Sequence, residues 1–178
     1  MKTTKIILAL VVGMAFTIDG NAQNDGKTPS LAINTTSYKT AIGLRAGETS
    51  GLTIKQFVSS EKAIEGIVGL WSHGLSATIL FEKYTPAFNV SGLNWYYGVG
   101  GHIALETGKY SYYYKNNRYT HYREGSFGLG IDGIIGLEYK IPSTPFALSL
   151  DMKPYIEVVT RGNTWMSLDP GLGIKVTF

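Results

Sequence analysis

The chain has 178 residues, with 22 glycines, 12 tyrosines, no cysteine and a formal net charge of +3. Its length fits one domain that is large enough to bury a core, and the lack of cysteine excludes disulfides, thiolate metal sites and a cysteine nucleophile. The small net charge, without any run of lysine or arginine, argues against binding to nucleic acid.

The first 22 residues follow the three-part pattern of a secretory signal peptide. Lys2 and Lys5 precede an apolar stretch over 6–16, which is shorter than the roughly 20 residues that a helix needs to cross a bilayer. Gly20 and Ala22 supply the small residues that a signal peptidase requires, so we expect cleavage after Ala22. The signal peptide (1–22) is followed by a polar periplasmic leader (23–37), and the remaining domain covers 38–178.

From residue 38 onward, hydrophobic residues alternate with polar or small ones at a period of two, which is typical of β-strands. In the clearest segment Leu148, Leu150 and Met152 share one face, whereas Asp151 and Lys153 share the other. Several segments are much longer than the roughly 5–6 residues usual in soluble proteins. We predict eight strands, over 38–46, 51–58, 63–72, 75–84, 93–105, 125–140, 146–159 and 165–178.

The two faces of these strands differ in chemistry, because one is apolar and the other combines glycines with charged side chains. The charged face carries six positive and seven negative residues, and buried charges of this kind need partners. A barrel of eight strands leaves just enough interior for side chains to fill. We expect a polar network in the lumen that includes Arg45, Glu65, Glu82, His102, Asp132, Glu138, Asp151, Lys153, Glu157 and Lys175, with Lys39, Lys55, Lys140 and Asp169 on the same charged face.

Aromatic residues are predicted to gather near one end of the apolar face, as in the girdles of membrane barrels. An even number of strands puts both termini at that same end, which we expect to be periplasmic, and Lys83 lies there too. The sequence therefore predicts an all-β, eight-stranded antiparallel up-and-down transmembrane β-barrel in an outer membrane, in contact with its lipid. A soluble β-barrel or sandwich is the alternative. The outward-facing aromatic residues in this prediction are Tyr38, Phe81, Trp95, Tyr97, Tyr139, Phe146 and Phe178.

The longest predicted connection, 106–124, holds six of the twelve tyrosines. Tyrosine favours strands, and Asn116 and Asn117 favour a turn, so we expect a β-hairpin that needs a bulge or a three-residue turn to keep its register. Tyrosine and arginine are common interface anchors, which makes the hairpin a candidate surface for an unknown extracellular ligand; the alternative is a collar that only anchors the barrel rim. The candidate contact residues are Tyr110, Tyr112, Tyr114, Arg118, Tyr119, Tyr122 and Arg123.

With its signal peptide, eight alternating strands and terminal Phe178, the chain resembles the small eight-stranded outer-membrane barrels of the OmpA/OmpX type. The segments AIEGIVGLW (63–71), GLNWYYGVGGHIA (92–104) and PFALSLDMKPYIE (145–157) are similar to those of a largely uncharacterised group of such proteins. The resemblance covers about residues 38–178. It implies that the outer-membrane insertion machinery recognises the last strand, LGIKVTF, and it carries over no residue of known function.

Two other activities can be compared with the residues present. A lipid hydrolase or acyltransferase needs a nucleophile, a base and an orienting acid, but Ser72 and His73 are neighbours that point to opposite faces of a strand, and His102 and His121 have no such partners in the pattern. A narrow porin-like channel for small solutes conflicts with a lumen filled by side chains. We therefore expect no catalytic residue, no cofactor and no metal, and a structural or surface-interaction role.

Overall fold

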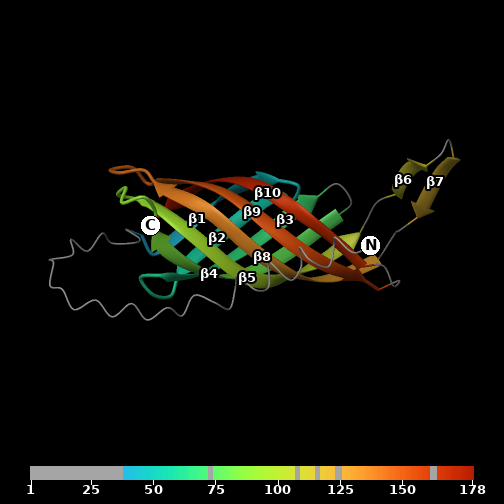
Figure 1. The fold of residues 1–178 in the computed structure, drawn as a ribbon, viewed down its shortest axis with the longest axis horizontal. Coiled ribbons are helices and arrows are strands. Elements are labelled where there is room, and N and C mark those ends of the chain that lie inside the picture. The colour runs from blue at the N-terminus through green and yellow to red at the C-terminus, as the bar shows by residue number, and fades with distance from the viewer. Residues whose placement is uncertain (1–37, 72–73, 107–108, 115–116, 123–125, 161–163) are drawn as a thin grey trace. The chain divides into compact units, whose positions relative to one another are not determined.

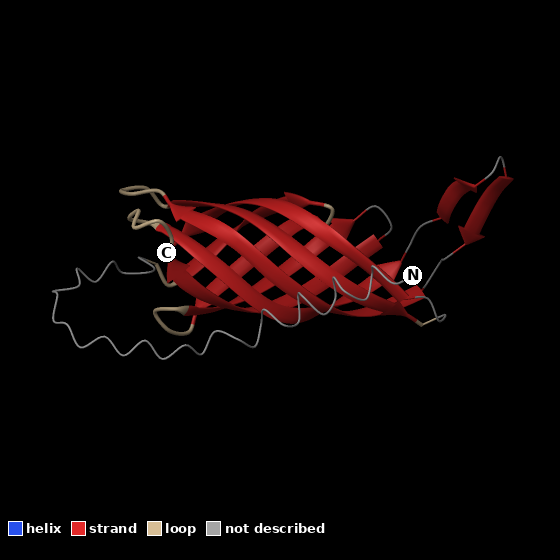
Figure 2. Cartoon of the chain, viewed as in Figure 1, coloured by secondary structure: helices blue, strands red, loops and turns tan. Residues whose placement is uncertain are grey.

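The computed structural model describes residues 38–71, 74–106, 109–114, 117–122, 126–160 and 164–178; at 71, 106, 109–114, 117–122, 126 and 165 the description covers the backbone. The signal peptide and the leader lie outside the described residues. Every regular element in the described ranges is a β-strand (Figures 1 and 2). Those ranges contain no helix long and apolar enough to span a membrane.

Eight long strands match the predicted segments within two residues at nearly every boundary, which confirms the period-two interpretation of the sequence. Two short strands, β6 and β7, lie between the fifth and sixth of the eight. The strands are β1 (Thr40–Gly47), β2 (Ser50–Phe57), β3 (Lys62–Trp71), β4 (Gly74–Pro86), β5 (Leu93–Glu106), β6 (Lys109–Tyr114), β7 (Asn117–Tyr122), β8 (Ser126–Lys140), β9 (Phe146–Val159) and β10 (Thr164–Thr177).

The eight long strands close into an antiparallel barrel in the order β1-β10-β9-β8-β5-β4-β3-β2. The first and last strands pair along their length, from Ala41 opposite Thr177 to Gly47 opposite Gly171. This closure confirms the predicted eight-stranded antiparallel up-and-down β-barrel and leaves the barrel without an unpaired edge. We call the end where β1 begins and β10 finishes the terminal end, and the opposite end the loop end.

Alternation along each strand puts one set of side chains inside the barrel and the other outside. In β9 the odd-numbered residues from Ala147 to Val159 are buried, whereas Leu148, Leu150 and Met152 are exposed. The interior also holds apolar side chains, because Ile67, Leu80 and other residues form a buried cluster in the lumen. That cluster comprises Tyr38, Ala41, Phe57, Ala63, Ile67, Leu80, Tyr84, Tyr96 and Ile134.

The prediction that Tyr38 faces outward is wrong, because this side chain is buried and its hydroxyl donates a hydrogen bond to Glu138 in the lumen. The backbone N–H groups of Lys39 and Thr40 both donate to the carbonyl oxygen of Phe178, at 2.9 and 3.2 Å. Two consecutive donors on one acceptor insert an extra residue, as a β-bulge does, and this reverses the alternation before β1. For the same reason Lys39 is exposed rather than part of the lumen.

The predicted hairpin is present as β6 and β7, which pair with each other from Lys109 opposite Tyr122 to Tyr114 opposite Asn117. The register shifts by one residue between the barrel and the hairpin, because Glu106 lies opposite Ser126 but Lys109, three residues further on, lies opposite Tyr122, four residues further back. Two residues separate β5 from β6 and three separate β7 from β8. The turn between β6 and β7 has two residues rather than the three that were one of the predicted alternatives. The one-residue offset instead falls between β7 and β8, in the connection 123–125, which lies outside the described residues.

Candidate functional site

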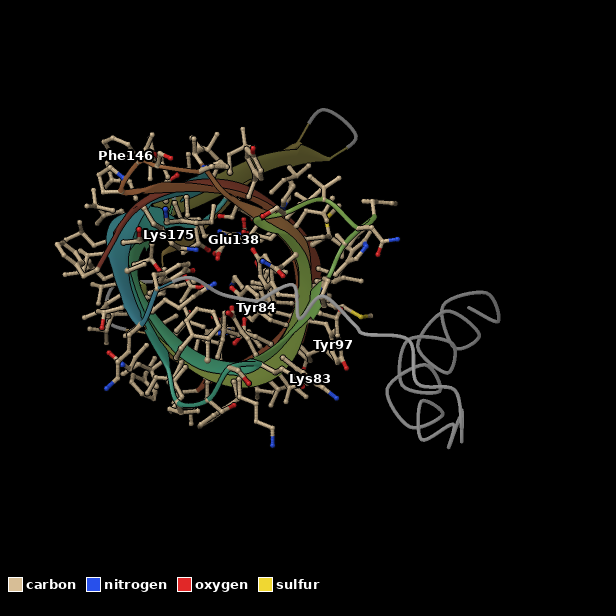
Figure 3. All side chains as sticks on the ribbon, turned by 90° about the vertical axis from the view of Figure 1, so that its left-hand side faces the viewer. Lys83, Tyr84, Tyr97, Glu138, Phe146 and Lys175 are labelled. Atoms are coloured by element: carbon tan, nitrogen blue, oxygen red, sulfur yellow. The ribbon has the colours of Figure 1, made fainter. Side chains whose placement is uncertain are left out.

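The lumen is the most densely organised polar site of the described chain, and the first of its two ion-pair clusters lies in the terminal half. Here the ammonium group of Lys55 lies 2.8 Å from both Glu65 and Glu82 and 3.3 Å from Glu138. Lys175 reaches Glu65 at 3.2 Å and Glu138 at 3.5 Å. We call these five residues the lysine cluster; Figure 3 shows Glu138 and Lys175 inside the ring of strands.

The second group, which we call the arginine cluster, lies in the loop half. Arg45 pairs with Asp151 at 2.6 Å and with Asp169 at 2.9 Å. Lys153 lies 3.1 Å from Asp132 and 3.6 Å from Asp169. Arg45 Nε also donates to Asp151 at 3.2 Å, and the guanidinium donates to the backbone oxygens of Thr49 and Asp169, so all five of its N–H donors are used.

His102 completes the arginine cluster, with Nδ1 2.8 Å from Asp132 and Nε2 3.1 Å from Glu157. An ionised carboxylate only accepts hydrogen bonds, so two carboxylate partners favour the imidazolium form in which both ring nitrogens donate. Glycine at 130 allows this arrangement, because a methyl group there would overlap the His102 ring.

Buried aromatic rings connect the two clusters. Tyr84 and Tyr96 are stacked with their centroids 5.3 Å apart, and the Lys55 ammonium lies 5.0 and 4.6 Å from these two ring centroids. The Tyr84 hydroxyl bonds to Glu82 and Glu138 of the lysine cluster, whereas the Tyr96 hydroxyl donates to Asp151 of the arginine cluster at 3.1 Å. The lumen is thus one connected network.

All ten residues assigned to the lumen from the sequence are buried there, but the expected near-balance of charge is wrong. Lys39 is exposed, and Lys140 is half-buried with its ammonium group bonded to the backbone oxygens of Ile141 and Thr144. Among the described residues the lumen therefore holds four Lys or Arg side chains against seven carboxylates, besides His102. The imidazolium form of His102 compensates one of the three excess negative charges.

Tyr84 is absent from the predicted polar network, although the alternation of β4 puts it on the same face as Glu82. Three polar atoms on this inner face, Ser76 Oγ, Thr78 Oγ1 and Glu82 Oε1, have no hydrogen-bond partner among the described residues. Ser76 and Thr78 line a small cavity of about 10 Å³ beside His102 and Glu157. By this measure the cavity is just large enough to hold one water molecule.

The residues considered for catalysis do not come together in the described structure. Ser72 and His73 lie outside the described residues, and only the backbone of His121 is described. His102 contacts two carboxylates rather than a nucleophile. Within the described ranges, no group of three or more histidines and acidic residues is arranged to hold a metal ion.

The candidate contact residues of the hairpin are described by backbone alone, except Arg123, which lies outside the described residues. The β6–β7 register sets Tyr112 opposite Tyr119, so Tyr110, Tyr112, Tyr114 and Tyr119 belong to one face of the two-stranded sheet. Arg118 and Tyr122 belong to the other. The register therefore divides the predicted contact set between two faces.

The outer surface of the barrel is apolar. Large hydrophobic side chains are exposed on every barrel strand, with Leu70 at 65% and Ile131 at 68% of their full exposure. Near the terminal end, five of the seven aromatic side chains predicted to face outward are exposed and Tyr139 is half-buried. Figure 3 shows Tyr97, Phe146 and Lys83 outside the ring of strands.

Comparison with known proteins supports the fold and leaves the family open. No protein-family model and no curated protein sequence matches the chain. Among solved structures, the chain is similar to the N-terminal β-barrel domain of Pseudomonas aeruginosa OprF, with a TM-score of 0.52 and 14% sequence identity. The match covers 78% of this chain and 95% of that domain. At this identity the likeness shows a shared barrel fold.

Proposed function

We propose that this protein is an integral outer-membrane β-barrel with a structural or surface-interaction role rather than an enzymatic one. In this proposal both termini are periplasmic and the hairpin over 106–124 is presented at the cell surface. The outer-membrane insertion machinery recognises the strand that ends in Phe178. The observation that carries the proposal is the inverted distribution of polarity, with the charged residues buried and the apolar ones exposed.

That inversion favours lipid over water as the surrounding solvent. A water-soluble barrel buries its large apolar side chains, since each contributes roughly 1.5–3 kcal/mol when removed from water. Here Leu44, Leu52 and Leu172 are each more than half exposed, whereas Lys55 and Asp169 are completely buried. In a membrane the exposed side chains would be covered by acyl chains, and the polar side chains would be satisfied inside.

The height of the apolar surface fits a bilayer. On β8 the outward residues run from Leu129 to Tyr139, a difference of ten positions. At about 3.4 Å per residue and a strand tilt of about 40°, this stretch spans roughly 25 Å, the height of the apolar band of outer-membrane barrels. The aromatic residues near the terminal end would then lie at the membrane–water boundary.

Cell fractionation combined with heat-modifiable gel mobility tests the proposal. The full-length protein should be found in the outer-membrane fraction and should migrate differently before and after boiling, because a closed barrel resists detergent at room temperature. An epitope inserted between Tyr114 and Asn117 should be labelled on intact cells, whereas one in the 58–61 turn should be labelled only after permeabilisation. A soluble periplasmic protein without a mobility shift would contradict the proposal.

A further inference from the structure

Two lysines face each other on the outer surface at the terminal end of the barrel. Lys62 is the first residue of β3 and pairs directly with Lys83 of β4, which in turn pairs with Tyr97 of β5. Lys62 and Lys83 are exposed, and Tyr97 is 42% exposed. Because adjacent strands are about 4.8 Å apart, the three residues form a row roughly 10 Å long; Figure 3 shows Lys83 and Tyr97 on the outside.

This pair is unfavourable unless an anion joins it, because like charges directly opposite each other on a sheet repel. Inside the barrel the same problem is solved by the protein, since Glu65 lies between Lys55 and Lys175 at 2.8 and 3.2 Å. Outside, neither Lys62 nor Lys83 forms an ion pair with any residue that the structure describes, Glu61 of the adjoining turn included. An anion from the surroundings would compensate the two charges.

The position of the pair points to the source of that anion. The next outward-facing pair along β3 and β4 is Ile64 with Phe81, which are 36% and 58% exposed and belong to the apolar surface. In the other direction the chain leaves β3 for the turn over 58–61. The two ammonium groups thus lie at the edge of the apolar band, where lipid headgroups meet acyl chains.

We propose that Lys62, Lys83 and Tyr97 form a binding site for the phosphate of an anionic phospholipid in the periplasmic leaflet. The two ammonium groups bind the phosphate oxygens, the Tyr97 hydroxyl donates a further hydrogen bond, and an acyl chain lies along Ile64 and Phe81. A net negative lipid is preferred because a zwitterionic headgroup brings its own cation to the two lysines. This inference rests on the proposed membrane location and adds a ligand class to it.

Native mass spectrometry of the folded protein tests the site, with phosphatidylglycerol and phosphatidylcholine of identical acyl chains as probes. The wild-type protein should retain phosphatidylglycerol preferentially. Lys62→Gln and Lys83→Gln should each reduce that preference about five-fold, the effect of roughly one lysine–lipid contact. The double variant should lose little more than either single one, because one phosphate needs both lysines.

Lys39→Gln is the matched control, since Lys39 is exposed at the same end but is not paired with another lysine; it should leave the preference unchanged. An equal loss of preference in all three single variants would mean that only the net charge matters, and this would overturn the site. An unchanged preference in the double variant would overturn it as well. In both cases a preserved heat-modifiable band from the outer membrane would leave the proposed function standing. A protein that never enters the membrane would instead contradict the proposed function itself.

Discussion

Asp151 and Leu150 are sequence neighbours whose side chains lie on opposite sides of the barrel wall. Asp151 accepts hydrogen bonds from Arg45 and Tyr96, whereas Leu150 is 56% exposed on the apolar surface. Replacing Asp151 with Leu leaves buried donors without their acceptor, so we expect a loss of about 3–5 kcal/mol in the free energy of unfolding. Leu150→Ile should cost less than about 1.5 kcal/mol.

Denaturant titration of both variants in the same detergent or vesicles measures this difference. Lys153→Leu is a second test, because Lys153 also lies in the arginine cluster and shares the inner face of β9 with the buried Tyr155. It should likewise be more destabilising than Leu150→Ile. If Leu150→Ile were the more destabilising change, the assignment of inside and outside would be reversed.

At the residue scale, alternation alone predicts which side of the wall a residue occupies, and it fails where the backbone leaves the strand. The bulge at Lys39 and Thr40 was not visible in the sequence, because it depends on both donors meeting the carbonyl of Phe178 across the barrel seam. The sequence also could not predict which charged side chains pair with each other in the lumen. Lys55 meets Glu138 only because β2 and β8 face each other across a narrow closed lumen.

At the element scale, the β6–β7 hairpin can be separated from the barrel by design. Glu106 and Ser126 are paired in the β5–β8 ladder, so an Asn-Gly turn can replace residues 107–125 in a two-residue hairpin. We expect the shortened barrel to keep its heat-modifiable mobility and to lose no more than about 1 kcal/mol of stability, since loops and short hairpins outside a barrel contribute little to its core.

The measurement is the denaturation midpoint of the shortened protein beside that of the full chain. A barrel that no longer folds would mean that the hairpin supports the wall, and it would favour the rim-collar interpretation over a contact surface. If the shortened barrel folds, binding to intact cells or to isolated surface glycans can be compared between the two proteins, because only the hairpin differs.

The long strands were predictable because apolar residues alternate with polar or small ones along the whole of each strand, and turn residues stand at both of its ends. Their pairing followed from chain order, since hairpin connections bring consecutive strands together. The hairpin itself was predicted, but the distribution of its tyrosines over two faces was not. That distribution depends on the register set by the two-residue connection between Tyr114 and Asn117.

At the scale of the whole molecule, the lumen determines whether the barrel can conduct. The two ion-pair clusters, the Tyr84–Tyr96 stack and the buried side chains of Ile67 and Leu80 fill it, and the cavity beside His102 holds about 10 Å³. The excess of carboxylates in the described lumen would favour cations over anions in an open ion pathway. The side chains that fill the lumen leave no room for such a pathway. We therefore expect the wild-type protein to show no stepwise conductance in planar bilayers.

The double variant Tyr84→Ala/Tyr96→Ala is the positive control, because it distinguishes a wild-type barrel with a filled lumen from one that has failed to insert into the bilayer. It removes the stacked rings between the two clusters and leaves every charge in place, so it should admit water and raise cation conductance above that of the wild type. Both proteins must show the heat-modifiable band from the same bilayer preparation. Resolved conductance steps from folded wild-type protein, with no increase in the variant, would contradict the filled lumen and make a small-solute channel the better interpretation.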